Sequence, residues 1–212
     1  MNVGGRQPSG VKLSGIYGIV DSVLTSDPLV LVDLMLEAGI RVLQYRAKSG
    51  VRREVLGGML ERTRAHGAAL IVNDDFDAAL EADGWHAGQE DLAHYDVRAV
   101  RARLGRRLFG VSCATPAEAR AAEAGGADYV GVGPFAATGS KADAGLAIGV
   151  PGVAAVVRAT QLPVVAIGGI GLANEAQVRV TGAAMAAVIS AIACAPDRAV
   201  AARLLVARWT PE

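Results

Sequence analysis

The chain has 212 residues, of which 52% are hydrophobic and only 4% aromatic, so it can bury one core built mainly from aliphatic side chains. Its 21 Lys and Arg residues balance its 21 Asp and Glu residues, which excludes an overall field that would attract nucleic acid or an anionic membrane. The two cysteines lack metal-ligand spacing and predict reduced thiols in a cytoplasmic protein. Composition leaves both a monomer and a homo-oligomer open.

Residues 1–14 are polar and Gly-rich without an apolar signal core, so we expect a flexible leader there. From Ile16 onward, short β-branched runs alternate with helical patterns, as in parallel βαβ units. The runs predict eight strands, at 16–21, 42–46, 69–74, 84–88, 108–112, 128–133, 163–169 and 186–190. Eight such units favour one α/β domain over residues 15–212, a (β/α)₈ TIM barrel, rather than a doubly wound sheet.

Helical patterns fill the gaps between the predicted strands. In one of them Thr115 is placed to begin a helix and Gly125 or Gly126 to end it. The most apolar stretch, 182–195, is too short to span a membrane and contains Ser190. We therefore interpret that stretch as a buried strand.

Polar side chains at the carboxyl ends of barrel strands usually form the active site. The second predicted strand ends in Gln44, Arg46 and Lys48, which the two-residue period of a strand places on one face. A buried Arg in that position needs a partner. Either a bound polyanion or a neighbouring carboxylate meets that need, and the sequence leaves both open.

Carboxylates end the next two strands. Asp74 follows the third strand, and Asp91 lies just after the short fourth strand. Mg²⁺ typically takes one or two such carboxylates together with water and phosphate oxygens. The alternative is that Asp74 or Asp75 caps the following helix and Asp91 caps a short turn. The cations of the second strand favour a Mg²⁺ site at Asp74 and Asp91.

The loops after the last three strands carry phosphate-binding features. Small residues surround Thr138, Ser140 and Lys141 after the sixth strand, although a surface loop can have the same composition. Gly168 and Gly169 end the seventh strand, where barrels commonly bind a phosphate together with the eighth. The sequence thus predicts two anion sites, one with a metal at strands two, three and six, and one without a metal at strands six to eight.

The order of motifs resembles the thiamine phosphate synthase family from Ile16 to about Trp209. These motifs are LQYRAK, IVNDD, WHAGQEDL, GVSCAT, GADYVGVGPFAATGSKAD, VVAIGGI and ISAI. The resemblance implies a Mg²⁺-dependent transferase. Its two small-molecule substrates would be 4-amino-2-methyl-5-(diphosphooxymethyl)pyrimidine and a thiazole phosphate, joined by a dissociative displacement that releases pyrophosphate.

The resemblance also implies a role for each site residue. The pyrimidine pyrophosphate would contact Gln44, Arg46, Lys48, Asn73, Ser112 and Lys141; Mg²⁺ would bind Asp74 and Asp91; the thiazole phosphate would contact Thr138, Ser140, Gly169, Ile189 and Ser190. The substrate-binding set also includes the neighbours Tyr45, Ala47 and Gly139. The catalytic set, which would stabilise the departing pyrophosphate, is Arg46, Lys48, Ser112 and Lys141.

The chain departs from the family pattern at Ala47, at Ala114 and in the segment before the eighth strand. Ala114 stands where a His is usual. A thiazole tautomerase-like paralogue, the nearest alternative, would use that His as its proton carrier and would not need Asp74. A phosphate-binding barrel without turnover is the other alternative. No histidine is needed for the synthase reaction, and His86 is expected to be a hydrogen-bonded scaffold residue.

Overall fold

A computed structural model describes residues 10–139 and 145–209. Its eight parallel strands pair in chain order and close into a barrel, with the last strand beside the first. The strands are β1 (Gly15–Asp21), β2 (Val42–Arg46), β3 (Ala69–Asn73), β4 (Gly84–Ala87), β5 (Leu108–Cys113), β6 (Tyr129–Val132), β7 (Val164–Ile167) and β8 (Met185–Val188). The predicted TIM barrel is confirmed, and each strand lies within two residues of its expected bounds.

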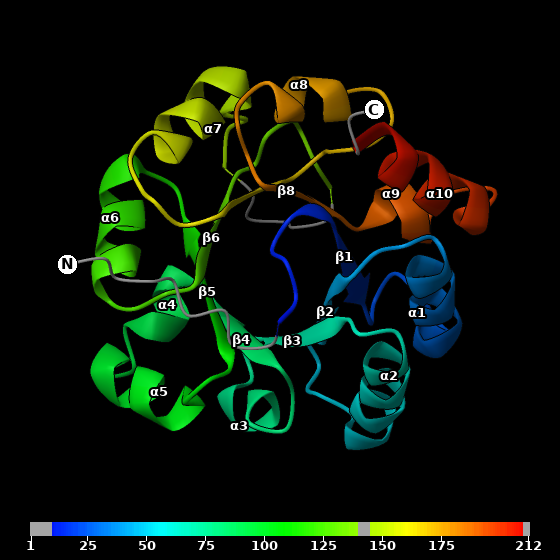
Figure 1. Ribbon diagram of the computed structural model, residues 1–212, viewed down its shortest axis with the longest axis horizontal. Coiled ribbons are helices and arrows are strands. Elements are labelled where there is room, and N and C mark those ends of the chain that lie inside the picture. The colour runs from blue at the N-terminus through cyan, green and yellow to red at the C-terminus, as the bar shows by residue number, and fades with distance from the viewer. Residues whose placement is uncertain (1–9, 140–144, 210–212) are drawn as a thin grey trace.

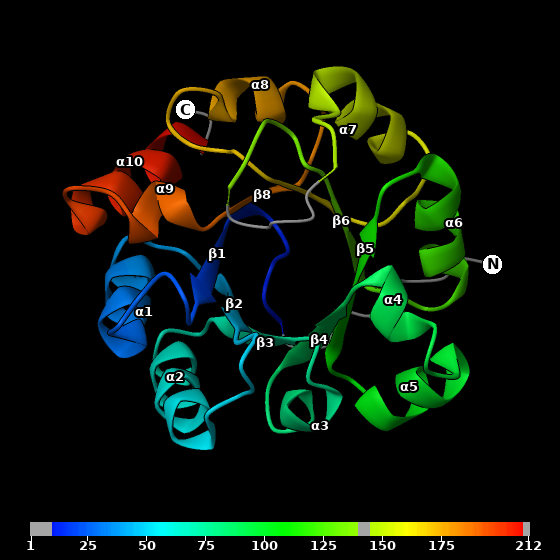
Figure 2. The ribbon, with the colours of Figure 1, turned by 180° about the vertical axis from the view of Figure 1, so that it is seen from behind.

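The helices form a ring around the barrel (Figures 1 and 2). They are α1 (Pro28–Glu37), α2 (Arg53–Ala65), α3 (Phe76–Ala79), α4 (Gln89–Leu92), α5 (Val97–Leu104), α6 (Pro116–Ala124), α7 (Gly149–Val157), α8 (Glu175–Arg179), α9 (Ser190–Ala193) and α10 (Arg198–Trp209). Local sequence sets several of their ends. Thr115 caps α6 by accepting from the Glu118 N–H, and Gly126 after its last turn has φ +85°.

Two hydrophobic cores lie on the two faces of the closed sheet. On β1, Tyr17 and Ile19 face the barrel interior, whereas Ile16 and Val20 pack beneath the helices. Both faces of each strand are therefore covered, which explains the consecutive apolar residues in the strand sequences.

The stretch 182–195 contains the buried strand we expected, but that strand occupies only part of it. Only Met185–Val188 is extended, and Ser190 begins α9 instead of lying inside a strand. The strands of this barrel have four to seven residues each, and after β8 the polypeptide enters a helix as soon as it leaves the sheet. Within the described ranges, no helix is long and apolar enough to cross a membrane.

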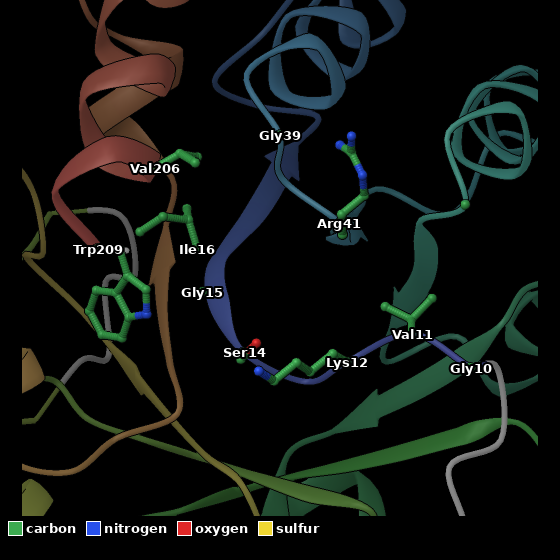
Figure 3. A pocket seen from close by; sticks show the side chains of 11 residues that line it. Gly10, Val11, Lys12, Ser14, Gly15, Ile16, Gly39, Arg41, Val206 and Trp209 are labelled. Atoms are coloured by element: carbon green, nitrogen blue, oxygen red, sulfur yellow. The ribbon is translucent and has the colours of Figure 1, made fainter. Parts of the chain in front are cut away.

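A cavity of about 590 Å³ lies at the amino end of the barrel, beside the starts of β1, β2 and β3 and the end of α10. Figure 3 shows Lys12 and Ser14 on the segment before β1, Arg41 before β2, and Trp209 on α10 around it. Arg41 is held there by bonds from Nη1 to the carbonyls of Leu36 (2.8 Å) and Ile40 (3.0 Å). Its guanidinium thus ties the end of α1 to the start of β2.

Val11 and Leu13 pack against the inner core at this same end. The segment for which we expected a flexible leader therefore contacts the barrel from Val11 onward, while residues 1–9 lie outside the described residues.

Candidate functional site

A second cavity, of about 620 Å³, lies at the carboxyl ends of the strands. Residues from both predicted anion sites line it. It is lined by most of the predicted site residues, namely Gln44, Arg46, Lys48, Asn73, Asp74, Asp91, Ser112, Thr138, Gly169, Ile189 and Ser190. Residues far apart in the sequence thus share one chamber large enough for two small ligands side by side.

Three residues of the predicted substrate-binding set do not line this cavity. Tyr45 is 1% exposed and packs in the outer core, because it alternates with Gln44 and Arg46 on β2. Ala47 packs against the same outer core, and Gly139 is exposed. The predictions for Ser140 and Lys141 lie outside the described residues.

Arg46 both lines the cavity and forms an ion pair with Asp21. The Asp21 side chain is 3% exposed and also accepts a bond from the Val23 N–H at 2.8 Å. Asp21 and Arg46 are direct partners in the register of β1 and β2. Sequence reasoning missed Asp21, although its place at the end of the neighbouring strand was a usable signal.

The backbone of Asp74 is fixed in an unusual conformation. Its φ is +62°, in the left-handed region that Asp enters more readily than most residues. Its N–H donates to the His86 carbonyl at 3.0 Å, and its carbonyl accepts from Trp85 Nε1 at 3.0 Å. Two bonds to β4 therefore hold Asp74 at the cavity, while the next residue, Asp75, caps α3 through Ala78 N at 2.8 Å.

Asp91 has the capping role that the sequence offered as one alternative, and it also lies at the cavity. Its Oδ2 accepts from the Gly88 N–H at 2.9 Å at the start of α4, and its side chain lines the cavity. No cluster of three or more His, Cys, Asp or Glu side chains that could hold a metal occurs in ranges 10–139 and 145–209. Two carboxylates that line one chamber still fit Mg²⁺, which completes its shell with water and substrate oxygens.

A chain of buried polar side chains lines part of this cavity. Gln44 Nε2 donates to the Tyr17 hydroxyl at 2.9 Å, and that hydroxyl lies 3.0 Å from the hydroxyl of Tyr129. Tyr129 lies 3.0 Å from His86 Nδ1, and His86 Nε2 lies 3.0 Å from Ser112 Oγ. His86 is thus the hydrogen-bonded residue we expected, whereas both tyrosines were missed because they looked like ordinary core aromatics.

Burial keeps this chain uncharged. Burial lowers the pKa of His86 to about 4, although the nearby Asp91 acts in the opposite direction. Burial also raises the pKa of both tyrosines well above the ordinary value of 10.0. At neutral pH the ring of His86 and both phenols are therefore neutral.

Two glycines leave space for the rings of Tyr129 and His86. A Cβ on Gly110 would lie 2.1 Å from Tyr129 Cζ, and a Cβ on Gly131 would lie 3.2 Å from His86 Cε1. The glycines in LFGVS and YVGV therefore accommodate rings from neighbouring strands.

The end of β7 supports the loop that follows β6. Phe135 N donates to the Ile167 carbonyl at 2.8 Å, and Ala136 N donates to the Gly168 carbonyl at 2.9 Å. Gly168 and Gly169 have φ +96° and +65°, and a Cβ on Gly169 would lie 2.5 Å from the Ala137 oxygen. The sequence suggested that these glycines let a phosphate approach the backbone. In the structure, the loop after β6 lies close to them.

Known proteins match this chain over most of its length. The family model described as thiamine monophosphate synthase matches residues 16–192. A thiamine-phosphate synthase of Moorella thermoacetica is 48% identical over 183 residues, which are 84% of this chain and 86% of that protein. A bifunctional thiamine biosynthesis protein of Symbiobacterium thermophilum is 44% identical over 205 residues, 94% of this chain but 41% of that protein.

A solved structure agrees with these sequence relatives. The thiamine phosphate pyrophosphorylase from Pyrococcus furiosus superposes with a TM-score of 0.83 at 32% identity, over 97% of this chain and 99% of the other. The motifs, the barrel and these matches lead to the same conclusion: the chain belongs to the thiamine monophosphate synthase family.

Proposed function

We propose that the cavity at the carboxyl ends of the strands holds both substrates of thiamine phosphate synthesis, with Mg²⁺ at Asp74 and Asp91. Membership of the family makes the chain a transferase that condenses the pyrimidine pyrophosphate with the thiazole phosphate. The observation that carries the proposal is the single chamber of about 620 Å³ that Asp74 and Asp91 line together with Arg46 and Lys48.

In this proposal the reaction breaks the bond between the pyrimidine CH₂ and the pyrophosphate oxygen and forms a bond from that carbon to the thiazole nitrogen. Arg46, Lys48 and Ser112 contact the departing pyrophosphate, and Lys141 adds a further charge. Fixed charges and donors of this kind stabilise negative charge that develops in the transition state. Bound Mg²⁺ supplies further charge neutralisation on the phosphate oxygens.

The two ends of the chamber then have different tasks. Gln44 and Asn73 contact the pyrimidine end, while Thr138, Gly169 and Ser190 contact the phosphate of the thiazole. Holding the two reactants together in one chamber is itself a large part of the rate increase. No proton-transfer group is required, which agrees with the neutral His86 and with Ala114 in place of a His.

Adjacent aspartates allow a matched test of the metal site. Asp74→Asn should lower kcat at least about 100-fold and abolish the Mg²⁺ dependence of pyrophosphate binding, measured by calorimetry with Mg²⁺ or EDTA. Asp75→Asn is the control, because Asp75 caps α3, does not line the cavity, and Asn is an equally good cap. Mg²⁺-dependent binding that survives in Asp74→Asn would place the metal elsewhere.

The proposal also covers location and assembly. A cytoplasmic protein is supported by two cysteines that are both free, with burial raising the pKa of Cys113 to about 12. For a homo-oligomer, the support is the row of exposed apolar side chains on α10, Val200 and Leu204, each 40% exposed and one turn apart. Light scattering of the purified protein tests the assembly, and Leu204→Glu should dissociate an oligomer formed through that row.

A further inference from the structure

The side-chain hydrogen bonds that connect Gln44 to Ser112 through Tyr17, Tyr129 and His86 form an unbranched chain. The direction in which protons are donated at one end therefore determines the direction at the other end, and we call this direction the proton order. Each phenol has one proton to donate, and a neutral imidazole has one N–H and one acceptor nitrogen. Reversing one bond therefore requires reversing every bond beyond it. Because a buried phenol proton without an acceptor is costly, only two orders remain, and they give Ser112 opposite roles.

The amide of Gln44 selects one of these orders. Its Nε2 carries only donors, so the oxygen of Tyr17 accepts at 2.9 Å. The single proton of Tyr17 is then left for Tyr129, 3.0 Å away. The proton of Tyr129 cannot return to Tyr17 and is donated to His86 Nδ1 at 3.0 Å.

The remaining steps follow at His86. Because Nδ1 accepts, the one proton of the neutral ring is on Nε2, which donates to Ser112 Oγ at 3.0 Å. The hydroxyl proton of Ser112 then has no place on His86 and is directed to the cavity that Ser112 lines.

We infer that this chain of hydrogen bonds fixes His86 as its Nε2–H tautomer and thereby holds Ser112 as a hydrogen-bond donor to the departing pyrophosphate. Tyr17, Tyr129 and His86 are positioning residues, since they act through Ser112. In the opposite order Ser112 would donate to His86 and turn lone pairs toward an anion, which repels it. The contact with pyrophosphate rests on the proposed function, whereas the tautomer does not.

The tautomer is measured directly by ¹⁵N NMR on the full-length, ligand-free protein with labelled histidines at neutral pH. His86→Gln identifies the His86 signals by their loss. We expect a protonated Nε2 and an unprotonated Nδ1. The reverse assignment would overturn the inference, whatever the protein does with its substrates.

A reversal experiment tests whether Gln44 sets the direction. Gln44→Glu keeps the size of the side chain, but once ionised the new carboxylate can only accept a hydrogen bond. The bonds beyond it should then reverse, and the proton of His86 should move from Nε2 to Nδ1 as the carboxyl ionises. An Nε2–H signal that persists at alkaline pH in the folded variant would show that Gln44 does not set the order.

An activity measurement tests the link to Ser112. Tyr129→Phe keeps the ring over Gly110 but removes the hydroxyl that donates to Nδ1, so kcat should fall about tenfold, with a smaller change in KM for the pyrimidine pyrophosphate. Tyr95→Phe is the matched control, because Tyr95 is 41% exposed and takes no part in the chain of hydrogen bonds. This variant should keep the wild-type kcat.

The two kinds of result separate the two proposals. An Nε2–H tautomer together with an unchanged kcat in Tyr129→Phe would overturn the role assigned to Ser112 and leave the proton order standing. An Nδ1–H tautomer would overturn the proton order while thiamine phosphate synthesis by the wild type remained.

Discussion

Arg46 has a protein partner and a place in the cavity at the same time. In the free protein Asp21 neutralises it, so the Arg46 side chain, which is 11% exposed, does not carry an uncompensated buried charge. In the proposed complex with pyrophosphate, the same guanidinium would be shared between Asp21 and the ligand. We therefore expect the pair to stabilise the site without ligand and to affect how strongly Arg46 binds pyrophosphate.

Asp21→Asn tests this sharing. The variant should lose about 3 kcal/mol of unfolding free energy, because the Arg46 charge stays buried without its partner. Added pyrophosphate should restore more stability to the variant than it adds to the wild type, measured by urea denaturation. Asp33→Asn, which breaks the more exposed pair with Arg62, should cost less than about 1 kcal/mol. Equal losses in the two variants would contradict this account.

The lowered pKa of His86 predicts how stability depends on pH. Its pKa falls from 6.5 to about 4 on folding, so the unfolded chain binds more protons between these values. This group's contribution is complete above pH 6.5 and is lost as the pH falls toward 4. Urea midpoints measured across this range should show a shallower decline in His86→Gln than in the wild type, and parallel declines would contradict the prediction.

At the scale of elements, the end of β7 and the loop after β6 act as one unit. Backbone bonds from Phe135 and Ala136 join them, and the left-handed glycines at 168 and 169 permit the contact. Thr138, on the supported loop, and Gly169, on the support, both line the cavity. The geometry of the proposed thiazole phosphate site therefore depends on this junction.

Gly169→Ala should disturb this junction. Its φ of +65° and the 2.5 Å approach to the Ala137 oxygen predict a loss of about 1–3 kcal/mol in unfolding free energy and a raised KM for the thiazole phosphate. Gly171→Ala is the matched control, because its Cβ would meet only Ala191 Cβ at 3.5 Å. A Gly169→Ala protein as stable as Gly171→Ala would show that the loop can move without cost.

Strand positions and facing were predictable from local pattern, because a period of two and buried β-branched runs are properties of short segments. That pattern correctly placed Gln44 and Arg46 inward. The same alternation places the side chain of Tyr45 outward, so Tyr45 should have been left out of the predicted substrate-binding set. The Asp21–Arg46 pair and the path from Tyr17 to Tyr129 depend on which strands become neighbours across a closed barrel. The place of Asp21 at the end of the preceding strand was a usable signal for the first, but no local signal in the sequence predicts the path from Tyr17 to Tyr129.

At the scale of the molecule, the two ends of the barrel differ in what they contribute. The carboxyl end carries the predicted chemistry, while Val11 and Leu13 cover inner-core residues at the amino end. This division is general in barrels of this kind, in which residues at the amino end serve stability.

Leu13→Ser tests the division. It should cost about 1 kcal/mol of unfolding free energy, since Leu13 is only partly buried, and should leave kcat unchanged below the melting transition. Lys12→Ser, at the exposed neighbouring position, should leave both stability and kcat unchanged. A reduced kcat in folded Leu13→Ser would mean that the two ends of the barrel are coupled.

The contact between Gly110 and Tyr129 also limits how such a sequence can change over evolutionary time. With a Cβ at 110 lying 2.1 Å from the ring, alanine is acceptable there only after the ring at 129 has been replaced by something smaller. That replacement in turn removes the link from Tyr17 to His86. We therefore expect the two positions to be inherited together, so that lineages which keep a tyrosine at 129 also keep a glycine at 110. A change at either position should mark a protein in which the hydrogen bonds from Tyr17 to His86 are absent.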